Sequence, residues 1–224
     1  MILYAIPTPL GGAAVDALPP AALDTVRSLK DFAVENAKSA RAFLGEIGMP
    51  VRELNIFEVE KDSIQPLREG RAMGLLSEAG CPAIADPGAM VVEAAHREGF
   101  KVVPLVGPSS IVLALMASGL EGQRFAFSGY LPRDAGQRVK RVRELEARSR
   151  KEAETEIFIE TPYRNDAMVS SLLETCAPTT RLCVAADLTL PSESVATRTI
   201  ADWRRAPPAI GKRPAVFLLL AHHR

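Results

Sequence analysis

The first half of the chain alternates short apolar runs with segments in which apolar residues recur at helical spacing. The pattern predicts strands over residues 2–6, 31–35, 72–77 and 101–106. It predicts helices over 19–29, 37–48, 89–99 and 108–119, with a short one over 63–70. Strands that alternate with helices in this way form a parallel sheet covered on both faces.

The second half follows a different pattern. A strand over 124–131 and a long charged helix over 133–154 precede a strand over 155–160 and a helix over 164–176. Further strands are predicted over 181–188, 194–200 and 214–221. Strands this closely spaced indicate a mixed sheet. We therefore expect an α/β protein of two domains, 1–119 with the ligand loops and 120–224 with the mixed sheet.

Three loops rich in glycine and proline follow predicted strands of the first domain, at 7–12, 79–88 and 106–110. The middle loop lies in "LLSEAGCPAIADPG", residues 75–88. A loop of this kind can be a stiff connector, or it can be shaped to fit a ligand. Ligands of open parallel sheets bind at the carboxyl ends of the strands, where all three loops fall. The convergence favours a binding site.

Composition narrows the function classes. The 224 residues are 47% hydrophobic and 24% charged, and 27 Lys and Arg balance 27 Asp and Glu, so no global basic field attracts nucleic acid or membrane. Apolar stretches are too short to span a bilayer, and "ILYAI" after Met1 lacks the features of a signal peptide. The three scattered cysteines favour a reduced, cytoplasmic location.

Metal and nucleotide motifs are also missing. The histidines are His96, His222 and His223, and the last two fall in an expected tail, which argues against a metal site or a histidine-based triad. GxGxxG, GxxxxGK[ST] and GxSxG do not occur. Ligand recognition must therefore depend on other backbone shapes.

Five ordered blocks carry a family resemblance: "YAIPTPLGG", "LLSEAGCPAIADPG", "VVPLVGPSSIVLALMASGL", "RFAFSGYLP" and "IFIETPYR". Together they resemble the tetrapyrrole methylase family of S-adenosylmethionine-dependent methyltransferases, and within it the branch that methylates ribose 2′-hydroxyls of small-subunit ribosomal RNA. The resemblance implies two α/β domains with the cofactor bent in the cleft between them, a homodimer, and direct methyl transfer without a metal. An activated donor leaves the protein mainly the task of alignment.

The same resemblance assigns residues to the cofactor. Gly80-Cys81-Pro82 matches the family's Gly-x-Pro loop, with Asp86-Pro87-Gly88 beyond it. Ser109 and Ser110 are as well suited to capping a helix as to binding the cofactor. Helix capping is also the commoner role for an acid such as Asp86, and Cys81 is better suited to filling space as a small side chain. The cofactor-binding residues expected from the resemblance are Pro7, Pro9, Gly11, Ser77, Gly80, Cys81, Pro82, Asp86, Pro87, Ser109 and Ser110.

The catalytic candidates are Glu35, Glu160, Tyr163 and Arg164, which all follow predicted strands. Glu35 can orient the methyl acceptor or can be a solvated or capping carboxylate. Arg164 can hold a phosphate and Tyr163 can stack on a base, or both can anchor the following helix. The residues alone leave these alternatives open.

Two stretches depart from the ribosomal RNA branch. Its members carry Gly-Asn-Leu where this chain has Gly11-Gly12-Ala13, and Glu-Asp-Thr-Arg where it has Glu35-Asn36-Ala37-Lys38. Lysine lacks the planar fork of arginine. The acceptor is therefore RNA, or alternatively a small tetrapyrrole-like molecule, and a third alternative is cofactor binding without transfer.

One stretch is strongly basic. Residues 133–151 carry eight cations against three acids, which predicts an RNA-binding helix unless the acids pair with the bases to give a merely solvated face. The cations are Arg133, Arg138, Lys140, Arg141, Arg143, Arg148, Arg150 and Lys151.

Overall fold

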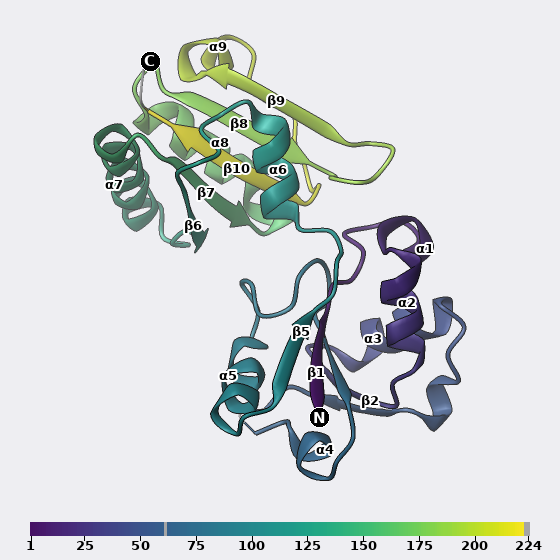
Figure 1. The fold of residues 1–224 in the computed structure, drawn as a ribbon. Helices are drawn as coiled ribbons and strands as arrows, with labels where there is room; N and C mark the ends of the chain where they lie inside the picture. Colours follow the sequence, from purple (N-terminus) through teal and green to yellow (C-terminus); the bar gives the residue numbers. More distant parts are fainter. Residues whose placement is uncertain (61, 222–224) are drawn as a thin grey trace. The chain divides into compact units, whose positions relative to one another are not determined.

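The computed structural model describes residues 1–60 and 62–221 and divides the chain into two compact units, Met1–Ser109 and Ser110–Arg224 (Figure 1). The boundary falls inside the stretch 108–119 that was expected to be helical, and the helix itself, Ser110–Ser118, belongs to the second unit. It packs against three strands of the second sheet, which is why it leaves the first unit. His222 and His223 lie outside the described residues.

The first unit is built on a five-stranded, entirely parallel sheet with the order β3-β2-β4-β1-β5. Its strands are β1 (Ile2–Ile6), β2 (Asp31–Val34), β3 (Asn55–Glu58), β4 (Met73–Leu76) and β5 (Lys101–Pro104). The inner strands β2 and β4 are buried along their whole length, whereas the edge strands are partly exposed. The continuous apolar runs therefore reflect burial on both faces.

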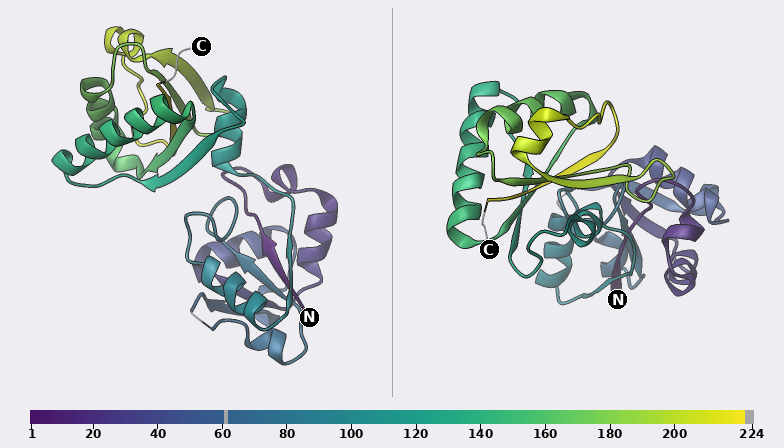
Figure 2. Two further views of the ribbon diagram at one scale, coloured as in Figure 1. Left: turned by 60° about the vertical axis from the view of Figure 1, so that its left-hand side comes forward. Right: turned by 90° about the horizontal axis from the view of Figure 1, so that it is seen from above.

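Helices cover both faces of this sheet (Figures 1 and 2). They are α1 (Ala14–Ala17), α2 (Pro20–Arg27), α3 (Ala37–Glu46), the 3-10 helix η1 (Val51–Glu53), α4 (Gln65–Arg68) and α5 (Ala89–Arg97). The period-two alternation of strand side chains separates two cores. Phe32 and Val34 pack in the core that includes Phe43 of α3, while Ala33 packs in the core that includes Val91 of α5.

The second unit contains a mixed five-stranded sheet with the order β6-β7-β10-β8-β9. Its strands are β6 (Phe125–Tyr130), β7 (Thr155–Glu160), β8 (Arg181–Ala186), β9 (Ser194–Thr199) and β10 (Ala215–Leu220). Only β6 and β7 pair in parallel, and the other pairs are antiparallel. Phe217 of β10 pairs with Phe158 of β7, and the two rings stack with centroids 5.8 Å apart.

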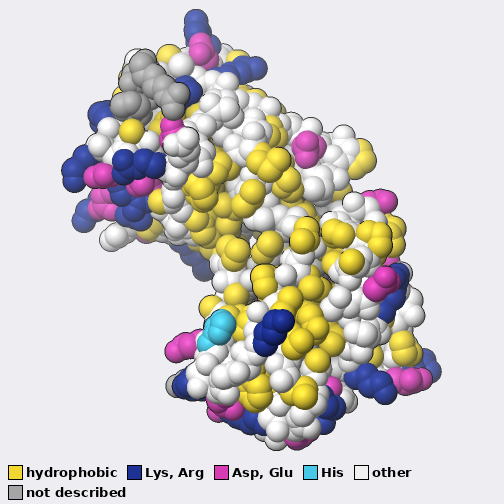
Figure 3. Space-filling view, in the orientation of Figure 1, with side chains coloured by type: hydrophobic (Ala, Val, Ile, Leu, Met, Phe, Trp, Pro, Cys, Tyr) yellow, Lys and Arg dark blue, Asp and Glu magenta, His cyan; other side chains and the backbone are white. Residues whose placement is uncertain are grey.

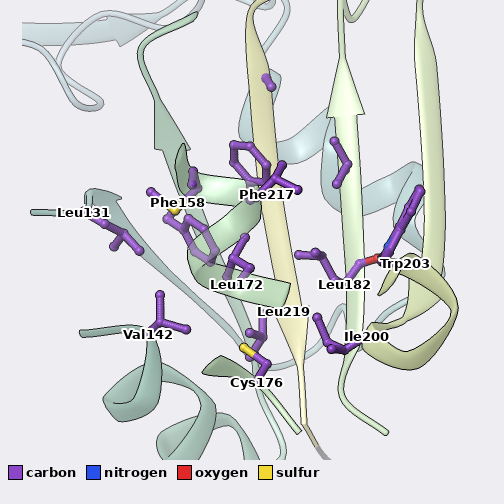
Figure 4. Close-up of a cluster of buried hydrophobic side chains, with 14 of the residues drawn as sticks. Leu131, Val142, Phe158, Leu172, Cys176, Leu182, Ile200, Trp203, Phe217 and Leu219 are labelled. Carbon is purple, nitrogen blue, oxygen red and sulfur yellow. Dashed lines mark hydrogen bonds between the residues drawn. The ribbon is translucent and has the colours of Figure 1, made fainter. Parts of the chain in front are cut away.

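The helices of this unit are α6 (Ser110–Ser118), α7 (Ala135–Glu152), the 3-10 helix η2 (Pro162–Arg164), α8 (Asn165–Thr175) and α9 (Ile200–Arg205). Buried side chains of α7, α8 and α9 meet the sheet in one core, shown in Figure 4. There the indole Nε1 of Trp203 donates a hydrogen bond to the carbonyl oxygen of Leu182 at 2.9 Å. Among the described residues, no helix is both long and apolar enough to cross a membrane.

The structure corrects the sequence prediction at three further places. Strand β3 was not expected, because only two of its four residues, Ile56 and Phe57, are apolar, and they lie between polar ones. The short helix α1 and the helix α9 were also missed. Thr199 caps α9 by accepting a hydrogen bond from the amide of Asp202 at 3.1 Å. The helix was missed because the strand predicted over 194–200 included this capping residue.

Candidate functional site

The three loops expected to form a site follow β1, β4 and β5, which are neighbours in the first sheet. Because all strands run in parallel, the loops leave the sheet at one edge. The convergence expected from the sequence is therefore present within the first unit.

The loops after β1 and β4 are joined by a backbone bridge between Thr8 and Gly80. The amide of Thr8 donates to the carbonyl of Gly80 at 2.9 Å, and the amide of Gly80 donates to the carbonyl of Thr8 at 3.0 Å. The hydroxyl of Ser77 also donates to the Gly80 carbonyl at 3.0 Å, and the Thr8 hydroxyl donates to the Ser77 carbonyl at 3.4 Å. Thr8 and Ser77 are buried, so this arrangement is fixed from both sides. The sequence analysis named Ser77 and missed Thr8, because no pattern signals an isolated bridge.

Gly80 is required at this bridge for two reasons. Its φ of +80° lies in the left-handed region that side chains disfavour. A Cβ there would also lie 3.2 Å from Cδ2 of Leu10 and 3.8 Å from the carbonyl oxygen of Pro108. The backbone at Gly80 therefore lies between the other two loops.

The third loop closes against the first two. The thiol of Cys81 donates to the carbonyl of Pro108 at 3.4 Å, and burial raises its pKa despite an opposing hydrogen bond with Ser109. A Cβ on Gly107 would lie 2.5 Å from Cβ of Pro7 and 2.7 Å from Cδ2 of Leu18. Gly107 thus lets the first and third loops touch, a role that sequence reasoning did not assign.

The loop after Gly80 stores backbone strain. Ala83 and Ala85 have φ of 66° and 65°, values that non-glycine residues adopt only when the surroundings impose them. Pro82 is buried between the bridge and this segment, while Pro87 is exposed. Strain of this kind concentrates at binding sites.

Three carboxylates gather at the same edge. Glu35, which follows β2, accepts a hydrogen bond from the amide of Glu78 at 3.0 Å. Partial burial, with the charges of Glu35 and Glu78, raises the pKa of Asp86 to about 6. Helix α5 begins without a side-chain cap, so the capping role favoured for Asp86 is wrong.

Asn36 explains part of the departure from the family pattern. Its Oδ1 accepts hydrogen bonds from the amides of Lys38 at 2.9 Å and Ser39 at 3.3 Å, and so caps α3. An aspartate would make the same bonds. Asparagine in place of aspartate at position 36 therefore preserves the N-terminal cap of α3.

The other catalytic candidates lie in the second unit. Glu160, 5% exposed, forms an ion pair with Arg164 and accepts from the Thr161 amide at 2.6 Å. This geometry favours the anchoring alternative for both. Tyr163 is 81% exposed, with the ammonium of Lys212 lying 5.2 Å from the centre of its ring.

The basic helix α7 is more neutral than its sequence indicates. Figure 3 shows cations and acids mingled over α7. Arg138 is buried and donates to the Ser171 hydroxyl at 2.9 Å, and Arg148 pairs with Glu156. Arg141, Arg150 and Lys151 pair with Glu144, Glu146 and Glu152. Within residues 1–60 and 62–221, Arg133, Lys140 and Arg143 have no ion-pair partner.

In the described part of the chain, no group of three or more His, Cys, Asp or Glu side chains could bind a metal ion. Cys176 and Cys183 are buried, and burial raises the pKa of the Cys176 thiol to about 12. Neither thiol is a nucleophile at neutral pH.

Comparison with known proteins decides the family. The model of the tetrapyrrole (corrin/porphyrin) methylases matches residues 8–203. The chain belongs to this family. Membership makes it a methyltransferase, and methyltransferases of this kind use S-adenosylmethionine in general.

Curated relatives of this tetrapyrrole methylase include two proteins named ribosomal RNA small subunit methyltransferase I. The protein of Mesorhizobium japonicum is 34% identical over 88% of this chain and 67% of its own length. The protein of Bacillus subtilis is 33% identical over 90% of this chain and 68% of its own length.

Solved structures show the same fold at lower identity. The methyltransferase CobJ matches with a TM-score of 0.62 at 18% identity, covering 98% of this chain and 93% of its own. Diphthine synthase matches with a TM-score of 0.65 at 18% identity, covering 98% of this chain and 89% of its own. The expected two-sheet fold of the tetrapyrrole methylases is confirmed.

Proposed function

We propose that this methyltransferase transfers a methyl group from S-adenosylmethionine to ribosomal RNA, at a ribose 2′-hydroxyl, and holds the cofactor on the three loops of the first unit. The observation that carries the placement is the bridge between Thr8 and Gly80. A Cβ on Gly80 would lie against Leu10 and Pro108, so the three loops meet at this residue. The names of the curated relatives support the RNA acceptor.

The residues present fit this cofactor. The carbonyl groups of Pro7, Pro9 and Pro82 and the backbone of Gly11 can bind the cofactor without interference from bulky side chains. Gly80 has both backbone groups bonded to Thr8 and keeps the first two loops together. Ser109 and Ser110 lie where the third loop leads into α6, and Pro87 follows Asp86 at the far end of the second loop. The cofactor supplies a methyl group on a sulfonium, which is already activated for transfer.

The chain's own part is alignment and proton handling. Asp86, with a pKa near 6, is mostly ionised at pH 7, and its carboxylate can accept the proton of a hydroxyl held beside it. Glu35 is held by the Glu78 amide, so it serves to keep this edge negatively charged.

The alternative acceptor, a tetrapyrrole-like molecule, has less support. Tetrapyrrole enzymes match this chain at 20% identity or below, and such similarity shows the fold alone. Cofactor binding without transfer remains the third alternative. An RNA acceptor also implies a cytoplasmic location.

The decisive experiment is transfer of a labelled methyl group from S-adenosylmethionine. The acceptors are total RNA, protein and small-molecule fractions from a strain that lacks the gene. We expect label in small-subunit ribosomal RNA that survives alkaline hydrolysis as an uncleaved dinucleotide, because a 2′-O-methyl group blocks cleavage. Label only in the small-molecule fraction, or label in no fraction despite tight cofactor binding, would exclude the proposal.

A further inference from the structure

A cavity lies on the second unit, and none of its lining residues belongs to the three loops. It encloses about 360 Å³ between strand β9 and the segment 206–213. Ser194, Ala196 and Arg198 alternate along β9 and line its floor. Pro207 and Pro208 form part of its wall. Val195 and Thr197 are the intervening residues, and the Thr197 hydroxyl donates to Ser118 of α6 on the other face.

The charges of this cavity are all positive. Two arginines line it, Arg198 and Arg213, and no acidic side chain does. Arg213 is fixed by the carbonyls of Ile210 at 3.0 Å and Ala209 at 2.8 Å and by the Ser194 hydroxyl at 3.0 Å. Asp187 lies 3.8 Å from it and offsets part of its charge. Arg213 thus holds the wall in place.

Arg198 is the cation left for a ligand. It is exposed and forms no ion pair with the residues that the structure describes. Its guanidinium lies 4.7 Å from the centre of the Trp203 ring, and Trp203 itself is 4% exposed. The guanidinium therefore lies within cation–π distance of the indole, which favours its position at the cavity.

A flat, cationic surface beside two proline rings suits one chemistry in particular. A guanidinium can donate two parallel hydrogen bonds to a phosphate and can stack on a nucleobase. Folded double helices keep their bases stacked inside, so only a single strand can offer a base and its phosphate together. Neutral or cationic ligands would leave Arg198 without a partner.

We infer that this cavity binds a phosphodiester of single-stranded RNA, with the phosphate on Arg198 and the adjoining base against its exposed guanidinium. This inference rests on the proposed RNA acceptor and adds a substrate-binding site on the second unit. The cavity shares no residue with the cofactor loops, so its loss leaves cofactor binding intact.

The test compares Arg198→Gln with Arg205→Gln. Arg205 lies on α9, is exposed and pairs with Asp202, so its replacement removes the same charge from outside the cavity. The probe is a labelled single-stranded fragment of small-subunit ribosomal RNA, titrated at several salt concentrations. Arg198→Gln should weaken binding by about tenfold at low salt and lower the log–log salt slope by about 0.7, the value for one phosphate contact on a single strand. Arg205→Gln should change neither.

A second variant separates charge from shape. Arg198→Lys should keep the salt slope but bind the RNA more weakly than the unaltered protein, because an ammonium offers no planar face. S-adenosylhomocysteine affinity should be unchanged in all three variants, and thermal melts that match the unaltered protein show that the second unit folds.

Each contrary result has a distinct meaning. If the protein methylates the RNA and Arg198→Gln binds it as Arg205→Gln does, the cavity is not an RNA site and the proposed function stands. If Arg198→Gln weakens binding of double-stranded RNA equally, the cavity is a non-specific basic surface and the inference is overturned. A protein that neither binds nor methylates RNA overturns both proposals together.

Discussion

Thr8 and Gly80 exchange both of their backbone hydrogen bonds, at 2.9 and 3.0 Å, although they follow different strands of the first sheet. The exchange fixes the loop after β1 against the loop after β4. Pro7, next to Thr8, in turn touches the backbone of Gly107 in the third loop. One pair of residues thus orders all three loops.

Replacing Gly80 by alanine should lower the affinity for S-adenosylhomocysteine. The new methyl group would crowd Leu10 and displace the loops that hold the cofactor, while the left-handed φ costs about 1 kcal/mol of folding stability for a residue with a Cβ. Calorimetric titration should show a loss of about tenfold or more, equivalent to ~1.4 kcal/mol.

Gly99→Ala is the matched control for that variant. Gly99 has a similar φ of +75°, open space around it, and a position before β5 at the opposite edge of the sheet. It should lose similar stability and keep full affinity. Undiminished affinity in a folded Gly80→Ala protein would show that the cofactor does not bind at the loops around Gly80.

Replacing Asp86 by asparagine should stabilise the first unit in a pH-dependent way. The folded pKa of about 6 lies above the ordinary value of 3.8, so the carboxyl lowers stability as pH rises between these values. The gain of Asp86→Asn over the unaltered protein should be near zero at pH 3.5. It should grow to about 1–2 kcal/mol above pH 6, less than the full shift implies because the group is partly exposed. Thermal melts across this range measure it, and a gain that does not vary with pH would contradict the raised pKa.

Substitutions in the ion pair between Glu160 and Arg164 can show whether Arg164 anchors the following helix or contacts the methyl acceptor. Arg164→Ala leaves a buried carboxylate without its cation and should cost about 3–5 kcal/mol. Adding Glu160→Gln to Arg164→Ala should recover part of that loss, which denaturant titration can measure. A fully stable Arg164→Ala protein that has lost only methyl transfer would show instead that Arg164 contacts the acceptor.

The unpaired cations of α7 should contribute to RNA binding. Lys140 and Arg143 are three residues apart, so they share one exposed face of the helix. Changing both to glutamate should weaken RNA binding and lower the log–log salt slope by roughly 1.5. Lys30→Glu with Arg52→Glu makes the same charge change at the amino edge of the first sheet and serves as the control. If both double variants bind RNA with equal affinity, the exposed cations of α7 are only solvated and do not contact RNA.

Arg138 is unsuitable for that test, because it is buried against Ser171 and its replacement would disturb the packing of α7 on α8. The basic composition of 133–151 therefore overstates the charge available to RNA.

A homodimer stays a prediction from the family resemblance. Light scattering at micromolar concentration should give about twice the 24.1 kDa mass of the chain. A mass equal to one chain at every concentration would contradict it.

The sequence by itself determined the class of fold and the place of the three loops rich in glycine and proline. Apolar runs in β1, β2 and β4 predicted buried parallel strands, because burial on both faces needs continuous apolar character. Gly80 and Pro82 marked the second loop, since only special backbone conformations call for such residues.

Only the tertiary structure decided what depends on residues far apart in the chain. Thr8 has no local signal, and its role exists because β1 lies beside β4. Arg138 and Arg198 are both arginines, yet Arg138 is buried against Ser171, whereas Arg198 is exposed beside Trp203. Charge is a property of composition, but its availability to a ligand depends on which side chains folding places beside it.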